Sequence, residues 1–411
     1  MSAAPVYDPS DPEVAANPHP ILARLRAEDP AHWSPALKSW VFTRHEDVRA
    51  LLLGDALSVG KLASFYKALP PREAELLRDI VHYLGLWLAF QDPPDHTRMR
   101  RIMRHAFQGP AIAAIESGVA PVVDHVLDRI DGRGRIDFVA EYALQVPAFV
   151  IMDLLGVERG MLDEFKRWSD DLAVFISGAR RADDKYERAA RGCKEMSGYF
   201  KDLIAERRAR PRNDFLGDLI AARDEGDSLS EDELIASCIL ILFAGHETTT
   251  NLIGCAAHAL LMHPGALARF RAEPALTASA IEEVMRWDGP SNCLVRVVAR
   301  EHELHGKRLR EGERVFVSIA GANRDPAVFA EPDRFKIERN PRGHLTFGQG
   351  IHACIGASLA REEGRVAVRR FFDRFPNAAL PEGGAVEWID AMVPRGLRRL
   401  DIVGIGGEGI G

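Results

Sequence analysis

Residues 345–356 read Leu-Thr-Phe-Gly-Gln-Gly-Ile-His-Ala-Cys-Ile-Gly and contain one cysteine, Cys354. The following run, residues 357–368, has helical spacing and good helix formers, so Cys354 is expected at or just before a helix N-terminus. There the helix dipole and unpaired peptide N–H groups stabilise negative charge and lower the pKa of a thiol. Gly348 and Gly350 allow the backbone to bend closely around the sulfur. A thiolate surrounded by peptide N–H groups suits a metal better than a protein substrate.

The residues around this cysteine have a specific spacing, because five fixed positions flank the sulfur. The positions are Phe347, Gly348, Gly350, His352, Cys354 and Gly356. This spacing resembles the haem-binding loop of the cytochrome P450 superfamily, the haem-thiolate monooxygenases. The resemblance implies haem b, with the Cys354 thiolate as axial iron ligand and cofactor contacts at Phe347, Gly348, His352 and Gly356. The alternative is a buried structural cysteine beside a Gly-rich turn.

Composition limits the class of protein. The chain has 411 residues with 46% apolar content, enough for a large core, and no linker-like stretch divides it. We expect one domain over residues 1–411, with 1–17 and 404–411 as peripheral tails. A net charge of -7 does not suggest a nucleic-acid or anionic-membrane partner. The sequence shows no apolar core of a signal peptide and no membrane span. Its five cysteines include no C-x-x-C pair, which fits a reducing cytosol. We therefore expect a cytoplasmic protein without a membrane anchor.

A long apolar helix is predicted from a capping-box pattern at Ser230 to Met262, about 48 Å at the helical rise. Its middle reads Ala-Gly-His-Glu-Thr-Thr, residues 244–249, and a glycine with consecutive threonines is a poor choice for a helix interior. Ala244 and Gly245 would leave space for a flat cofactor and O2. The alternative is a helix–helix crossing made of small residues.

Two residues in this segment are candidate catalytic groups. The Thr248 hydroxyl could donate a hydrogen bond to dioxygen, and the Glu247 carboxylate could relay protons through water. The pair resembles the acid–alcohol motif of the P450 family, with Glu where many members have Asp.

Basic residues cluster on a helix that begins at Asp92-Pro93-Pro94. His96 and Arg100 are four residues apart and share a face. By resemblance they bind haem propionates, and a generic basic helix is the alternative. Arg296 lies in a predicted strand among apolar neighbours and would need an anionic partner if buried. By resemblance that partner is also a propionate, with His352 as a further donor.

Glu283 and Arg286 form a Glu-x-x-Arg pattern that alone indicates only a surface ion pair. Its position about seventy residues before Cys354 resembles a buried pair of the family that joins a later arginine, here Arg339, and braces the haem loop. We interpret the three residues as structural.

The resemblance also implies substrate contacts. Residues 58–90 correspond to a variable loop over the haem, residues 390–396 to a turn that enters the pocket, and residues 177–184 to a short connection between two lid helices. An ordinary helical hairpin is the alternative to the lid, and apolar core is the alternative for Leu240 and Phe243. The expected contacts are Leu86, Trp87, Leu240, Phe243, Ala244, Leu294, Val295, Met392 and Val393.

A second set of basic residues could bind an electron donor. Arg361, Arg365 and Arg369 repeat every four residues on the helix after Cys354. With Arg98, Arg101 and His105 they would form a basic patch that steers an acidic electron-transfer protein. A plain solvated face is the alternative.

These patterns predict a mainly α-helical P450 fold with small β-sheets and a long central helix. The predicted activity is insertion of one oxygen atom from O2 into a C–H or C=C bond of an apolar small molecule. Electrons would come from NAD(P)H through a reductase and a ferredoxin or flavodoxin, since no flavin or Rossmann fingerprint is visible. A peroxide-driven hydroxylase of the same fold and a non-enzymatic haem-thiolate sensor are the alternatives. The sequence does not identify the substrate, the redox partner or the oligomeric state.

Overall fold

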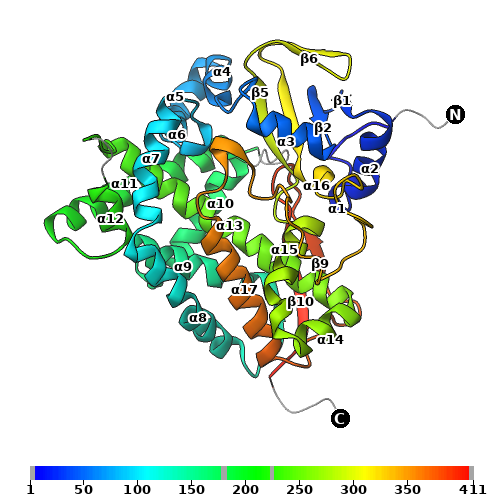
Figure 1. Ribbon diagram of the computed structural model, residues 1–411. Coiled ribbons are helices and arrows are strands. Elements are labelled where there is room, and N and C mark those ends of the chain that lie inside the picture. The colour runs from blue at the N-terminus through cyan, green and yellow to red at the C-terminus, as the bar shows by residue number, and fades with distance from the viewer. Residues whose placement is uncertain (1–4, 177–182, 223–225, 407–411) are drawn as a thin grey trace. The chain divides into compact units, whose positions relative to one another are not determined.

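The computed structural model in Figure 1 describes residues 5–176, 183–222 and 226–406. The chain folds into two compact units. The first unit comprises Met1–Leu57, Ala120–Val146 and Thr248–Gly411, and the second comprises Ser58–Val119 and Pro147–Glu247. The single domain expected over residues 1–411 stays a prediction.

The second unit is helical. Its elements are α4 (Lys61–Lys67), α5 (Pro71–Leu76), α6 (Arg78–Gly85), η1 (Leu88–Phe90), α7 (Asp95–Phe107), the first part of α8 (Pro110–Ile130), most of α9 (Gln145–Leu155), η3 (Arg159–Met161), α10 (Leu162–Ile176), α11 (Lys185–Ala209), α12 (Phe215–Ala221) and the first part of α13 (Glu231–Met262). Buried Asp171 of α10 joins α11 through Arg188 and Arg191, at 2.9 and 2.7 Å. Most of the predicted lid connection, residues 177–182, lies outside the described residues.

The variable loop expected over residues 58–90 is wrong as a description of this interval, because α4, α5, α6 and η1 occupy most of it. The proline and the glycine at the starts of two of these helices are compatible with helix formation. Pro71 occupies the first turn of α5, where its missing N–H would have no partner in any case. Gly60 precedes α4 as its N-cap residue.

The first unit contains the three β-sheets of the described residues, except that Ser58, the last residue of β3, belongs to the second unit. A five-stranded sheet has the order β1 (Ala31–Ser34), β2 (Ser39–Phe42), β8 (Arg314–Ser318), β5 (Cys293–Val298), β3 (Leu57–Ser58). A three-stranded sheet has the order β4 (Gly134–Asp137), β10 (Leu397–Ile405), β9 (Val386–Trp388), and β6 (His302–Leu304) pairs with β7 (Lys307–Leu309). Strands β5 and β8 are antiparallel with Val295 opposite Phe316, and β5 confirms the strand predicted around Arg296.

The helices of the first unit surround these sheets. They are α1 (Pro12–Ala16), α2 (His19–Glu28), α3 (His45–Leu53), the end of α8, the π-helical turn η2 (Val139–Ala143), the end of α13, α14 (Pro264–Ala272), η4 (Pro274–Leu276), α15 (Thr277–Asp288), α16 (Ile319–Ala322), η5 (Gly350–His352) and α17 (Ala357–Arg374). Helix α17, orange in Figure 1, is held to the end of α8 by ion pairs from Arg374 to Asp128 and Asp131. On its buried side, the Tyr142 hydroxyl donates to the carbonyl of Ala367 at 2.7 Å. These contacts fix the helix that follows Cys354.

Helix α13 has the length predicted from the sequence, 32 residues. Its capping box is present: the Ser230 hydroxyl accepts from the N–H of Glu233 at 3.3 Å, and the Glu233 carboxylate accepts from the N–H of Ser230 at 2.8 Å. In the described ranges, no single helix has the length and hydropathy of a membrane span, although the bent pair Asp95–Phe107 and Ile112–Ile130 meets both criteria.

The peripheral tails expected at residues 1–17 and 404–411 stay a prediction, although the described parts of both segments contact the fold. Tyr7 is buried, and Arg395 donates hydrogen bonds to the carbonyls of Ala15 and Ala16 at 2.9 and 3.0 Å. Gly404 and Ile405 belong to β10. Hydrogen bonds from Arg395 hold residues 15 and 16, and strand pairing with β4 holds Ile405.

Candidate active site

The cysteine loop in the first unit has the local structure expected from its sequence. The N–H of Cys354 donates to the carbonyl of Phe347 at 2.9 Å, and Gly356 is the N-cap residue of α17. Cys354 is exposed and lies two residues before this N-cap residue. A thiol in this position is accessible to a metal and lies near unpaired helix N–H groups.

Glycines determine the path of this loop. Gly348 and Gly350 have φ angles of 66° and 71°, in the left-handed region that side chains rarely adopt. A Cβ atom on Gly350 would lie 2.9 Å from the carbonyl oxygen of Leu52 on α3. A Cβ atom on Gly348 would touch Leu294 of β5 at 3.8 Å, so the loop lies directly beside this strand.

Two residues missed by the sequence analysis hold the start of the loop. The Asn323 side chain accepts from the N–H of Leu345 at 2.7 Å and donates to the Thr346 hydroxyl at 2.9 Å. The Thr346 hydroxyl in turn donates to the carbonyl of Met285 on α15 at 2.7 Å. A buried asparagine needs partners for its amide, but nothing in the local sequence indicates which backbone atoms supply them.

The Glu-x-x-Arg pattern forms a fully buried bidentate ion pair in α15. Arg286 donates to both carboxylate oxygens of Glu283 at 2.8 Å, and Arg339 approaches Glu283 at 3.1 Å, as expected from the resemblance. Arg286 also donates to the carbonyl of Asn323 at 3.1 Å. The pair is thus connected to the loop brace. Removing one partner of a buried pair of this kind costs about 3–5 kcal/mol, because the other charge is left uncompensated.

The predicted propionate-binding residues occupy both units. In the first unit, Arg296 and His352 are half-buried, and strand alternation places Arg296 on the same face of β5 as Leu294, the face beside the cysteine loop. In the second unit, His96 and Arg100 lie on α7, with His96 buried. Burial lowers the pKa of His96, and neighbouring Arg100 lowers it further. An acquired carboxylate would oppose both effects.

The middle of α13 carries a strip of incompletely buried residues. Between Glu233 and Leu260 the helix is buried except at Leu240, Phe243, Ala244, Gly245, Glu247, Thr248 and His258. Ala244 and Thr248 are exposed, and their i, i+4 spacing puts them on one face with Leu240. The predicted cofactor and catalytic positions are therefore those that the protein leaves uncovered.

The two ionisable residues of this segment differ. Burial lowers the pKa of His246 to about 4. The Nδ1 atom of its ring lies 2.7 Å from the carbonyl oxygen of Leu242, and the ring packs against Phe165 of α10. Burial raises the pKa of Glu247 to about 7, with a contribution from the charge of Asp170. Glu247 can therefore both donate and accept a proton near neutral pH, as a proton relay requires.

A comparison with known families explains this combination of an exposed cysteine loop and an uncovered helix centre. The family model for cytochrome P450 matches residues 66–390. This chain belongs to the cytochrome P450 family. The predicted fold, mainly helical with small sheets, and the predicted enzyme class, P450 monooxygenase, are confirmed.

Several relatives match this P450 over nearly its whole length. Cytochrome P450 107B1 of Saccharopolyspora erythraea is 37% identical, over 95% of this chain and 96% of its own. Vitamin D(3) 25-hydroxylase of Pseudonocardia autotrophica is 38% identical, over 94% of this chain and 93% of its own. The solved structure of epothilone B-bound cytochrome P450epoK has a TM-score of 0.89 and 30% identity, with 98% of this chain and 100% of that chain covered.

The residues of this P450 fit the haem-thiolate iron that the family uses. A thiol at a helix N-terminus is a suitable ligand for iron, and two left-handed glycines keep the loop around it free of side chains. Arginine and histidine side chains from β5, α7 and the loop provide donors for carboxylates.

For Gly245, the structure favours the alternative of a helix crossing. A Cβ atom at this position would lie 2.4 Å from Cδ1 of Ile151 on α9, so the glycine is needed for close helix packing. Sequence reasoning assigned the missing side chain to cofactor space because it could not identify the neighbouring helix. A direct cofactor contact by Gly245 stays a prediction.

The predicted substrate contacts form separate groups. In the second unit, Leu86 ends α6, and Trp87 packs against Phe243 at 5.7 Å between ring centroids. In the first unit, Val295, Met392 and Val393 pack against one apolar cluster, while Leu294 packs against another. Leu294 and Val295 were expected to face the same pocket, but adjacent strand residues point to opposite faces of a sheet.

Most of the predicted docking residues make ion pairs. Arg98 pairs with Glu233 and Asp227, Arg365 with Glu362, and Arg369 with Asp373. Arg361 pairs with Glu282 at 2.6 Å and lies over the Phe347 ring at 4.3 Å from its centroid. These carboxylates reduce the positive field that the sequence suggested.

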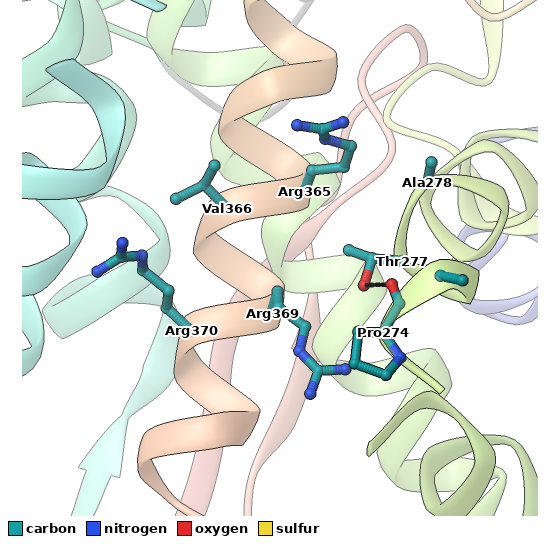
Figure 2. A pocket seen from close by; sticks show the side chains of 8 residues that line it. Pro274, Thr277, Ala278, Arg365, Val366, Arg369 and Arg370 are labelled. Carbon is teal, nitrogen blue, oxygen red and sulfur yellow. Dashed lines mark hydrogen bonds between the residues drawn. The ribbon is translucent and has the colours of Figure 1, made fainter. Parts of the chain in front are cut away.

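A cavity of about 410 Å³ lies beside this part of α17. Figure 2 shows Arg365, Val366, Arg369 and Arg370 on one side, and Pro274, Thr277 and Ala278 on the other. None of the predicted haem, catalytic or substrate residues lines it. Arg370 is paired with Asp124, and Arg369 donates to the carbonyl of Phe270 at 2.7 Å, so the guanidinium groups are largely occupied by protein acceptors.

Gly350→Ala should weaken haem binding by about tenfold or more. The left-handed backbone costs alanine about 1–2 kcal/mol, and the close approach to Leu52 displaces the loop further. Haem release to an acceptor apoprotein and the absorbance of the ferrous carbon monoxide complex measure the effect. Gly312→Ala is a matched control, because its φ of 83° has a similar backbone cost but no atom lies within 4 Å. Equal haem release from both variants would contradict the assigned role of Gly350.

Proposed function

We propose that this P450 inserts one oxygen atom from O2 into a C–H or C=C bond of an apolar small molecule. The observation that carries the proposal is the uncovered strip of α13, in which a carboxyl group with a pKa near 7 directly precedes an exposed threonine hydroxyl. A relay of this kind serves a reaction that consumes protons when dioxygen is cleaved. A peroxide-driven hydroxylase or a haem-thiolate sensor would not need it.

The chain's residues have distinct roles in this proposal. Cys354 binds iron through its thiolate, while His96, Arg100, Arg296 and His352 hold the propionates of haem b. Haem supplies the iron that activates dioxygen when it is bound. Glu247 passes protons inward, and the Thr248 hydroxyl donates a hydrogen bond to dioxygen.

The proposed substrate is a largely apolar molecule. Its proposed contacts are Leu240, Phe243 and Ala244 on α13, Leu86 and Trp87 after α6, and Leu294, Met392 and Val393 in the first unit. The names of relatives refer to vitamin D3 and epothilone B, which are both large and mainly apolar. This agreement supports the substrate class but does not identify the compound.

We further propose that electrons from NAD(P)H reach the enzyme through a reductase and a ferredoxin or flavodoxin in the cytoplasm. The basic residues of α7 and α17 are the proposed docking groups. Because several are paired with carboxylates, we assign them to steering and orientation rather than to strong binding.

Arg101→Glu with Arg365→Glu should slow reduction by the donor about tenfold at low salt and weaken its salt dependence, because the charges that attract an acidic protein are reversed. Stopped-flow reduction at several ionic strengths measures this. Arg24→Glu, an exposed change on α2, is the control. An unchanged rate and salt dependence in the double variant would exclude this docking site.

Thr248→Ala should lower the product formed per electron consumed by about tenfold, with the missing electrons recovered as peroxide, because proton delivery loses its hydroxyl. Product, NAD(P)H and peroxide are measured together. Thr249→Ala is the matched control, since Thr249 is buried on another part of the helix surface. Unchanged coupling in Thr248→Ala would contradict the monooxygenase proposal, and efficient product formation from peroxide alone would favour the peroxide-driven alternative.

Glu247→Gln should remove a pH dependence from turnover. The raised pKa keeps Glu247 protonated below pH 7, whereas above pH 7 the carboxylate no longer donates, so the proton-limited rate should fall as pH rises through about 7. The glutamine variant should be slower by about a hundredfold and flat over this range. Turnover from about pH 5.5 to 8.5 tests this, with Asp232→Asn on the same helix as control. The same decline in the glutamine variant would assign the titration to another group.

A further inference from the structure

The indole N–H of Trp87 is a buried hydrogen-bond donor that the protein does not satisfy. Trp87 lies between α6 and η1 and is 2% exposed. Within the described ranges, its Nε1 atom has no hydrogen-bond acceptor. Buried tryptophan N–H groups usually find a partner, because water is no longer available to them.

Other tryptophans of this chain follow that rule. Trp40 donates to Glu313 at 2.7 Å, Trp168 to Glu195 at 2.9 Å, and Trp287 to the carbonyl of Asp333 at 2.9 Å. The indole N–H groups of these three residues have protein acceptors, whereas that of Trp87 has none among the described residues.

The surroundings of Trp87 explain the missing acceptor and indicate where one could come from. Its ring is stacked on Phe90 at 5.7 Å with an interplanar angle of 9° and is tilted against Phe243 at 5.7 Å. Neither neighbour has a side-chain acceptor. Phe243 belongs to the uncovered strip of α13, next to exposed Ala244. The donor is thus held by aromatic rings at the edge of the proposed binding region.

We propose that Trp87 donates this hydrogen bond to an oxygen atom of a molecule bound beside Phe243. The acceptor is either a hydroxyl or carbonyl oxygen of the substrate or a carboxylate oxygen of a haem propionate. If it belongs to the substrate, Trp87 orients an otherwise apolar molecule and contributes to the choice of the oxidised carbon. This inference rests on the proposed function for its binding region but requires no turnover.

The substrate source is tested with Trp87→Phe, which keeps an aromatic ring and removes the donor. Vitamin D3 and its 3-deoxy analogue are titrated into the ferric holoenzyme, and binding is followed by the change in haem absorbance. The variant should bind vitamin D3 about tenfold more weakly and the deoxy analogue unchanged. Equal weakening for both compounds would reflect lost ring packing and would count against a substrate acceptor.

The propionate source is tested by haem transfer to an acceptor apoprotein. If Trp87 holds a propionate, Trp87→Phe should release haem about tenfold faster than the parent enzyme, whereas the two proteins loaded with haem dimethyl ester should release it at similar rates. Trp168→Phe is the matched control for both assays, because it removes an indole N–H that already has a protein acceptor.

A measurement on the unmodified enzyme avoids dependence on a folded variant. The indole N–H resonance of Trp87 is followed by NMR in the ferrous carbon monoxide holoenzyme labelled with ¹⁵N-tryptophan. If the acceptor belongs to the substrate, this resonance should move downfield when vitamin D3 binds but not when the deoxy analogue binds. If the acceptor is a propionate, the resonance should differ between the enzyme loaded with haem and the enzyme loaded with haem dimethyl ester. No change with either pair, together with unchanged binding and haem release in Trp87→Phe, would overturn the inference. Because these measurements need no product, they can show that the Trp87 inference is wrong even if the Thr248→Ala test supports the proposed monooxygenase activity, and the reverse.

Discussion

A thiolate that binds iron must be held close to backbone N–H groups while its sulfur stays uncovered, and this requirement shapes the cysteine loop. Two glycines in left-handed conformation, Gly348 and Gly350, turn the backbone in front of Cys354. The helix that follows supplies the electrostatic stabilisation. The path of the loop also depends on contacts with the elements around it, because two of its turns lack side chains that could pack.

Contacts within the first unit therefore hold the cysteine loop in place. Asn323 and Thr346 attach its start to α15, where the buried pair of Glu283 and Arg286 fixes several carbonyl groups in place. Helix α17 is anchored to the end of α8 at its other end. A buried ion pair often contributes little net stability, but it imposes a definite geometry on its neighbours, which is what a metal-binding loop requires.

The centre of α13 meets a different requirement. A helix that buries most of its surface leaves one strip uncovered, and two residues of that strip, Gly245 and Thr248, are poor helix formers. Partial burial gives Glu247 a pKa near neutrality, a value that an exposed glutamate would not have. Residues with low helix propensity thus occur in the same part of α13 as the proposed proton path.

The sequence alone determined the parts that depend on short-range spacing. It predicted the cysteine at a helix N-terminus, the capping box and length of α13, and the strand around Arg296. The burial of Glu283 with Arg286 and their link to Arg339 were expected only from the family resemblance. Tertiary structure decided the features that depend on which distant residues become neighbours. Gly245 faces Ile151, Asn323 holds the loop, and Leu294 and Val295 separate onto two faces. Trp87, packed between aromatic rings, has no hydrogen-bond acceptor among the described residues. Periodicity and capping act within a few residues, whereas burial, ion pairing and pKa depend on contacts between segments far apart in the chain.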